Sequence, residues 1–329
     1  MPSRRRVLAA ALAAGPVQGT VQGPARAQGE AWPDRPVRFI VPFPPGQAAD
    51  LLGRILAEEL SKRWPQRVVV ENRPGGAGAI GMEAIARAAP DGATFGIGTS
   101  GTLGVNPSVI ARLPYDVARD FAPVTGIFTL PLLIVANPAF PPADIRALVA
   151  YVKANPGQQF ASAGPATAQH MAAELFALRA GLRMAHVPYR GSGPAIADLI
   201  AGNVALMFDS SSSALPHVQS GRIRALAVTS TTRLPQLPEI PTVAETVIPG
   251  YEAAGWSGLV APAGTPPGII RRANADTVAV LRDAAVVRRI NEMGAFPSPG
   301  SPQEFADFVR AEVAKWGEVA RAANVRLEG

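Results

Sequence analysis

Residues 37–62 read VRFIVPFPPGQAADLLGRILAEELSK and predict a strand, a stiff loop and an amphipathic helix in succession. The strand is Val37–Val41 and the helix is Ala48–Lys62. The apolar residues of this helix recur at helical spacing: Leu52, Ile55, Leu56 and Leu60. The loop between them contains prolines, which stiffen it, so the loop would lose little conformational entropy if it bound a ligand. Gly46 would allow such a ligand to approach the backbone closely. Strand, loop and helix together form the repeating unit of an α/β protein.

The same alternation continues through most of the chain. Further strands are expected at 67–71, 94–98, 130–136, 159–163, 184–188, 205–209, 224–229 and 256–261. Further helices are expected at 80–88, 107–111, 144–155, 168–180, 194–201, 213–220, 267–282, 285–293 and 302–323. Two such series predict two lobes, each a mostly parallel sheet flanked by helices. The trailing helices have no strand partners of their own, so we expect them to fold back onto the first lobe.

The first 27 residues read as a secretory signal peptide. They combine a basic start, the short apolar run Val7–Ala14 and an A-x-A cleavage site, Ala25 to Ala27. Ser3-Arg4-Arg5-Arg6 also loosely fits a twin-arginine signal. The formal net charge is +6, but four arginines and no acidic residue lie in this segment, which leaves +2 for the rest. With those basic residues scattered, we expect no nucleic-acid partner. The absence of cysteine excludes disulfides and thiol catalysis.

GAGAIG, from Gly76 to Gly81, matches the G-x-G-x-x-G fingerprint of dinucleotide-binding turns. Such a site also needs an acidic residue about 20 positions later, at the end of the next strand. That strand here is followed by Thr99-Ser100-Gly101, and Asp91 comes too early. Tight turning and close backbone packing therefore explain the glycines better than nucleotide binding does.

Two loops point instead to an anion held between the lobes. The first is the Gly46 loop, and the second is Gly164-Pro165-Ala166-Thr167, which follows a strand and opens a helix. Helix N-termini present free N–H groups and about half a positive charge, which favours anions. Two such turns facing each other across a cleft would suit a carboxylate.

The whole mature chain resembles the periplasmic solute receptors of tripartite tricarboxylate transporters, the Bug family. The motifs that carry the resemblance cover about 300 residues in family order. They are PDRPVRFIVPFPPGQAADLLGRILAEEL, VVVENRPGGAGAIG, APDG, NPSVIARLPYD, FASAGPATAQHMAAEL, HVPYRGSGPAIADLIAG, MFDSSSSALPHVQSGRIRALAVTS, LPEIPTVAE and APAGTP. In these receptors the glycine-rich loop occurs without any nucleotide.

The resemblance implies a type II periplasmic binding protein fold with two lobes joined by two crossovers. We expect the first lobe at 28–128 and 252–329, the second at 129–251, and the crossovers near 125–130 and 248–254. The first-lobe ligand contacts implied are Phe43, Gly46, Gln47, Thr99 and Ser100. The second-lobe contacts implied are Ser162, Gly164, Thr167, His170, Arg190, Gly191, Ser192, Asp209 and Ser210. The chain departs from the family pattern at Gln47, Pro165-Ala166 and Ser210, which puts the identity of the ligand in doubt.

Several of these residues have structural alternatives. His170 and Glu174 are spaced as metal ligands on one helix face, but no second pair accompanies them, so we expect no metal. No serine completes a G-x-S-x-G elbow. Asp209 is either a capping acid or an acceptor for a donor group on the ligand, and Arg190 is either a ligand contact or a rim residue in solvent.

We therefore expect an exported periplasmic, monomeric receptor without catalytic activity or cofactor. It captures a small carboxylate-bearing ligand and delivers it to membrane transporter subunits. An exported NAD(P)-dependent oxidoreductase that uses the GAGAIG loop is the alternative, and a receptor that serves signalling is a second one.

Overall fold

The computed structural model describes residues 32–327, and from Pro33 onward the chain forms one compact unit. The predicted signal peptide, residues 1–27, lies outside the described residues. Within residues 32–327, no helix combines the length and the apolar character needed to cross a membrane.

One end of this unit is built around three parallel strands. They are β1 (Val37–Val41), β2 (Val68–Asn72) and β3 (Thr94–Thr99), and they pair in the order β2-β1-β3. Beyond β3, the sheet continues with β9 (Ala254–Pro262) and β4 (Phe121–Ala136), both antiparallel to their neighbours. A two-residue strand, β10 (Phe296–Pro297), pairs with the other edge of β4 and was not predicted.

The other end repeats the plan with β5 (Gln158–Ser162), β6 (Met184–Pro188), β7 (Leu206–Ser210) and β8 (Arg224–Val228). β5 is parallel to β6 and β7, whereas β4 is antiparallel to β7 and β8. Each sheet is therefore mixed: parallel in its outer part, as predicted, and antiparallel where β4 or β9 takes part.

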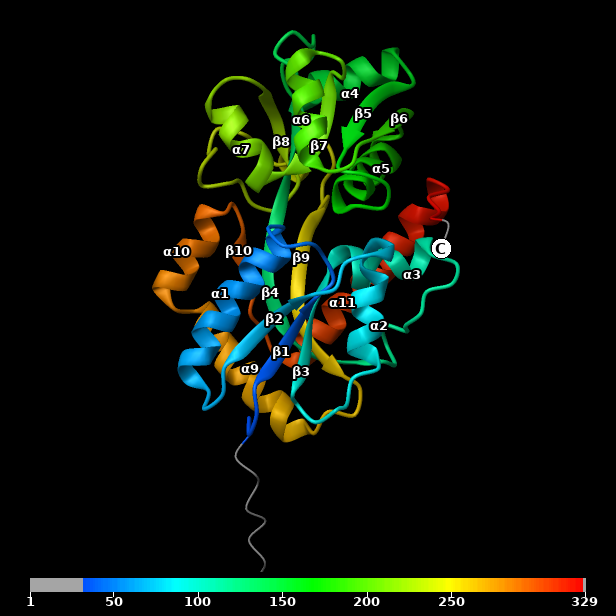
Figure 1. Cartoon of the computed structure of the whole chain (residues 1–329). Coiled ribbons are helices and arrows are strands. Elements are labelled where there is room, and N and C mark those ends of the chain that lie inside the picture. Colours follow the sequence, from blue (N-terminus) through cyan, green and yellow to red (C-terminus); the bar gives the residue numbers. More distant parts are fainter. Residues whose placement is uncertain (1–31, 328–329) are drawn as a thin grey trace, which may run out of the picture. The chain divides into compact units, whose positions relative to one another are not determined.

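Helices cover both sheets (Figure 1). Those of the first lobe are α1 (Ala48–Arg63), α2 (Ala79–Ala86), α3 (Asn106–Val109), α9 (Pro267–Leu281), α10 (Ala284–Glu292) and α11 (Pro302–Ala322). Those of the second lobe are α4 (Ile145–Ala154), α5 (Ala168–Ala180), α6 (Ser192–Ala201), α7 (Ser211–Gln219) and α8 (Val243–Thr246). Gly76–Gly78 forms a 3₁₀ turn, and Ser100–Val105 forms a π-helical turn that the sequence pattern did not predict.

Strands β4 and β9 cross between the lobes side by side (Figure 1). In β4, residues up to Pro131 pair with β9, and residues from Leu132 onward pair with β7. The predicted strand 130–136 was too short, because β4 begins at Phe121. Pro123 and Gly126 interrupt the strand pattern there, and the register shifts beside both residues, as expected at β-bulges. The lobe boundaries at 128/129 and 251/252 stay a prediction.

The last helix, α11, packs onto the first lobe, as expected, and also contacts the second lobe. Trp316 and Val319 of α11 share a buried cluster with Met171 and Leu175 of α5, which belongs to the second lobe. The other end of α11 places Phe305 in a first-lobe cluster with Trp256. A 21-residue helix is about 30 Å long, so it reaches both lobes.

Candidate functional site

A cavity of about 440 Å³ lies between the two lobes, beside the crossover strands. Six of the residues predicted as ligand contacts line it: Phe43, Gln47, Thr99, Ser100, Gly164 and Thr167. None of its lining residues carries a charged side chain. An anion in this cavity would therefore be held by backbone and hydroxyl dipoles.

On the first-lobe side, the N-terminus of α1 opens onto the cavity. Gln47 is the N-cap residue, with φ −79° and ψ 160°, and its side chain does not cap the helix. Ala48 and Ala49 line the cavity, and their N–H groups have no acceptor within the helix because they belong to its first turn. Two backbone donors are thus available at this wall.

Gly46 does not supply a free donor. Its N–H donates to Oδ2 of Asp50 at 2.9 Å, and Asp50 also accepts from Arg54 and from Nδ2 of Asn72. Asp50 is buried, and the hydrogen bonds from these groups lower its pKa against the opposing effect of burial. Because the N–H of Gly46 is occupied, Ala48 and Ala49 are the backbone donors that line the cavity on this side. The expected contact between Gly46 and the ligand stays a prediction.

On the second-lobe side, the loop 164–167 leads into α5 in a similar way. Thr167 is the N-cap: its Oγ1 accepts from the N–H of His170 at 3.3 Å and donates to the carbonyl of Gly164 at 2.8 Å. The next two residues, Ala168 and Gln169, line the cavity and belong to the first turn. Their N–H groups are the second pair of donors without an intrahelical acceptor.

His170 and His186 support this loop from behind. Their rings stack with centroids 3.7 Å apart and an interplanar angle of 13°. Nδ1 of His170 accepts from the N–H of Ala166, a residue held at φ 56°, in the left-handed region. Nε2 of His186 lies 2.6 Å from Oγ of Ser162, which in turn accepts from the N–H of Gly164. Ser162 and His170 therefore shape the loop and do not line the cavity.

Burial and the neighbouring His170 lower the pKa of His186 to about 3. Nδ1 of His170 must be unprotonated to accept from Ala166. The loop geometry thus depends on Nδ1 of His170 as an acceptor and on the stacked ring of His186.

The remaining predicted contacts lie beside the cavity. Asp209 is fully buried, and its carboxylate oxygens accept from the hydroxyls of Ser192 and Ser213, each at 2.5 Å. Burial raises its pKa. The hydroxyl of Ser210 is hydrogen-bonded to that of Ser213, and the N–H of Gly191 donates to the carbonyl of Ala163. The side chain of Arg190 is exposed. Through the hydroxyls of Ser192 and Ser213, Asp209 ties α6 and α7 to the end of β7. Both interpretations of Asp209, as a capping acid and as a ligand acceptor, stay predictions.

Several lining residues escaped the sequence analysis. The crossover strands contribute Phe128, Leu130, Gly255 and Trp256, and Asn106 and Tyr189 complete the wall. Nδ2 of Asn106 donates to the carbonyl of Ala77 in the glycine-rich loop. The pairing of β4 with β9 brings Phe128, Leu130, Gly255 and Trp256 to the cavity. β4 is buried along almost its whole length and shows no alternation, so no local pattern indicated this wall.

The glycine-rich loop is explained by packing. A Cβ on Gly78 would lie 2.5 Å from Cγ2 of Thr102, and a Cβ on Gly81 would lie 2.7 Å from Cα of Pro42. Both glycines therefore allow close packing: Gly78, in the 3₁₀ turn, packs against side chains, and Gly81, in α2, packs against backbone, as the sequence predicted for this loop. Nε2 of His170 lies 3.3 Å from Glu174, and among residues 32–327 no group of three His, Asp or Glu side chains is arranged to hold a metal.

Comparison with known proteins identifies relatives along nearly the whole chain. Residues 52–325 match the tripartite tricarboxylate transporter family receptor. The protein BugT of Bordetella pertussis is 38% identical over 301 residues, which cover 91% of this chain and 92% of BugT. Rpa4515 of R. palustris, solved with adipate, is 37% identical with a TM-score of 0.79, covering 90% of this chain and 99% of that one. MatC of Rhodopseudomonas palustris, solved with malate, is 31% identical with a TM-score of 0.75, covering 88% and 99%.

These likenesses confirm the two-lobed periplasmic binding protein fold and extend over both lobes. Most of the Bug-family motifs quoted above fall within residues 52–325, and the first of them, which begins earlier at Pro33, supplies Phe43, Gln47, Ala48 and Ala49 to the cavity wall. The chain belongs to the tripartite tricarboxylate transporter receptor family, the periplasmic solute-binding Bug proteins.

Proposed function

We propose that this protein captures a small carboxylate-bearing ligand between its lobes and delivers it to the membrane subunits of a tripartite tricarboxylate-type transporter. The observation that carries the proposal is the convergence of two helix N-termini, α1 and α5, on one cavity without charged side chains. Each N-terminus supplies N–H donors and a partial positive charge, so each can bind one carboxylate group.

A ligand with two carboxylates suits this arrangement. Adipate and malate, bound by the two relatives above, each carry two such groups. One carboxylate would accept from Ala48 and Ala49, and the other from Ala168 and Gln169. Aromatic and aliphatic residues, among them Phe43, line the space between the two ends.

A screen of dicarboxylates by thermal unfolding tests this function. A ligand at a hundred times its Kd adds about 2.7 kcal/mol to the free energy of unfolding. For a chain of this size we expect the Tm to rise by about 5 °C. Adipate and malate are the first candidates, and NADH serves as the control for the nucleotide alternative. A Tm that rises with NADH and with no carboxylate would contradict the proposal.

We also expect the lobes to close on the ligand. The chain crosses between them through β4 and β9, and few residues need to change conformation for two lobes to rotate about such a pair. Small-angle scattering at saturating dicarboxylate should show a smaller radius of gyration than scattering without ligand. Because α11 contacts both lobes, the change should be modest; identical profiles would exclude closure.

The N-terminal segment and the family support a proposal on where the protein acts. We propose export to the periplasm, with the twin-arginine route as one possibility raised by Arg4 and Arg5. We further propose that the receptor acts as a monomer and catalyses no reaction. The oxidoreductase alternative has no support in the structure, since packing accounts for Gly78 and Gly81.

A further inference from the structure

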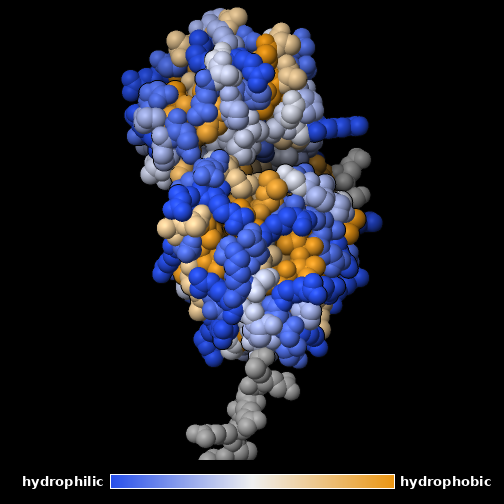
Figure 2. All heavy atoms as spheres, turned by 60° about the vertical axis from the view of Figure 1, so that its left-hand side comes forward, coloured by the Kyte–Doolittle hydropathy of each residue, from blue (hydrophilic) through white to orange (hydrophobic). Residues whose placement is uncertain are grey.

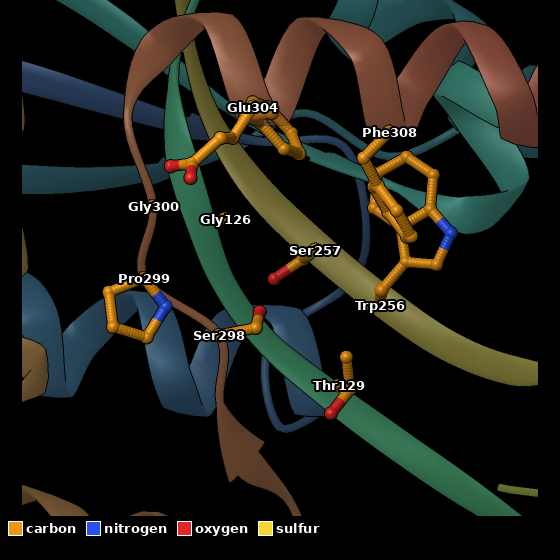
Figure 3. Close-up of a pocket in the computed structure, with 10 residues that line it drawn as sticks. Gly126, Thr129, Trp256, Ser257, Ser298, Pro299, Gly300, Glu304 and Phe308 are labelled. Atoms are coloured by element: carbon orange, nitrogen blue, oxygen red, sulfur yellow. The ribbon is translucent and has the colours of Figure 1, made fainter. Parts of the chain in front are cut away.

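A second cavity, of about 310 Å³, lies within the first lobe (Figure 3). Its walls are the crossover strands β4 and β9, the segment 298–300 and the first turns of α11. Trp256 lines both this cavity and the one between the lobes. The volume falls in the range of small-molecule sites in proteins.

Ser257 gives this cavity an unused hydrogen-bonding group. The residue is 1% exposed, and its Oγ has no hydrogen-bond partner among the described residues. Figure 3 shows the hydroxyl directed into the cavity. A buried hydroxyl without a partner is unfavourable, and alanine would fit the same strand position without that cost. The serine is accounted for if a ligand in the cavity completes its hydrogen bond.

The opposite ends of the cavity differ in chemistry. At one end, Oε2 of Glu304 accepts from the N–H of Ser301 at 2.7 Å, which leaves Oε1 as an acceptor. At the other end, the rings of Trp256 and Phe308 lie 5.0 Å apart at 72°, and Phe308 is 39% exposed. In Figure 3, Ser257 lies between the Glu304 carboxylate and these rings. No lysine or arginine lines the cavity.

We propose that this cavity binds a small amphipathic cation, with an ammonium group, a hydroxyl and an apolar ring or chain in that order. The ammonium donates to Glu304, the hydroxyl pairs with Ser257, and the apolar part packs on Trp256 and Phe308. The carboxylate favours a positively charged partner, and the aromatic rings at the other end favour an apolar one.

The test uses 2-amino-1-phenylethanol as the probe, titrated by calorimetry into the mature chain. Two analogues remove one group each: 2-phenylethylamine lacks the hydroxyl, and 1-phenylethane-1,2-diol replaces the ammonium. We expect Ser257→Ala to lower the affinity for the probe about threefold to tenfold and to leave the affinity for 2-phenylethylamine unchanged. We expect Glu304→Gln to lower the affinity for the probe about threefold and to leave the affinity for the diol unchanged.

Asp307→Asn is the matched control, because it removes a carboxylate one turn along α11 without touching the cavity. Asp307 pairs with Arg310 and does not line the cavity, so this variant should bind the probe as the natural protein does. Absence of binding at millimolar probe would overturn the proposal. Equal losses of probe affinity in Asp307→Asn and Glu304→Gln would also overturn it. The same holds if a folded Ser257→Ala variant binds the probe with full affinity.

Discussion

Ala48→Pro and Ala168→Pro should each weaken dicarboxylate binding about tenfold to a hundredfold. Each change removes one N–H at the first position of α1 or α5, and a hydrogen bond to a charged group contributes about 1.5–3 kcal/mol. The helices should persist, because proline is accepted at that position and needs an extended preceding residue. Gln47 and Thr167 are extended, with ψ 160° and 161°. Calorimetry with the ligand found by the thermal screen measures the effect.

Ala284→Pro is the control for this pair. Ala284 is the first residue of α10, follows the extended residue Asp283, and does not line the cavity between the lobes. The Ala284→Pro variant should bind the ligand with unchanged affinity. Arg190→Ala should also change little, since Arg190 is exposed and lies outside the cavity lining. A larger loss in Arg190→Ala than in the proline variants would mean that a cationic side chain dominates binding.

Acidification should destabilise the protein through His186. The pKa of this ring is about 3 in the folded chain, well below the usual 6.5, so between those values the unfolded chain binds a proton that the folded chain does not. The free energy of unfolding therefore falls as the pH falls from 6.5 toward 3. One proton corresponds to at most about 1.4 kcal/mol per pH unit between these two pKa values.

His186→Phe should remove this contribution while retaining a stacked ring beside Phe160 and His170. Urea unfolding at pH 6.5, 5.5 and 4.5 gives the slope of the free energy of unfolding against pH for the natural protein and for His186→Phe. Ser162→Ala is the control, because it deletes the hydrogen bond to His186 but leaves the titrating group in place. If His186→Phe retained the full slope, another group would be responsible, such as His217, whose pKa burial also lowers.

The surface shows why the functional residues could not be found from hydropathy alone. Figure 2 shows a largely hydrophilic face with separate apolar patches. Exposed apolar side chains such as Leu51, Val69 and Ile80 lie on α1, β2 and α2, and none of them lines the cavity between the lobes. Exposure of apolar groups is common on soluble proteins and does not by itself mark a site.

Local patterns in the sequence determined the elements and the family. The strand Val37–Val41 and the helix that begins at Ala48 follow from periodicity, and the structure places both as predicted. The loop before α1 and the loop before α5 could be recognised as candidate anion sites, because the chemistry of a helix N-terminus is local to a few residues, and both loops line the cavity between the lobes. The motifs, taken together, identified the receptor family.

Tertiary structure alone decided which donors are free and which residues meet. The N–H of Gly46 is occupied because a buried carboxylate four residues later, Asp50, lies against it. His170 and His186 stack although 16 residues separate them, and β4 meets β9 across more than a hundred residues. Contacts of this kind depend on how distant segments pack, and a sequence pattern reports only the residues within one element. The cavity between the lobes is assembled from such contacts, and for that reason its crossover wall, with Phe128, Leu130 and Trp256, appeared only in the folded chain.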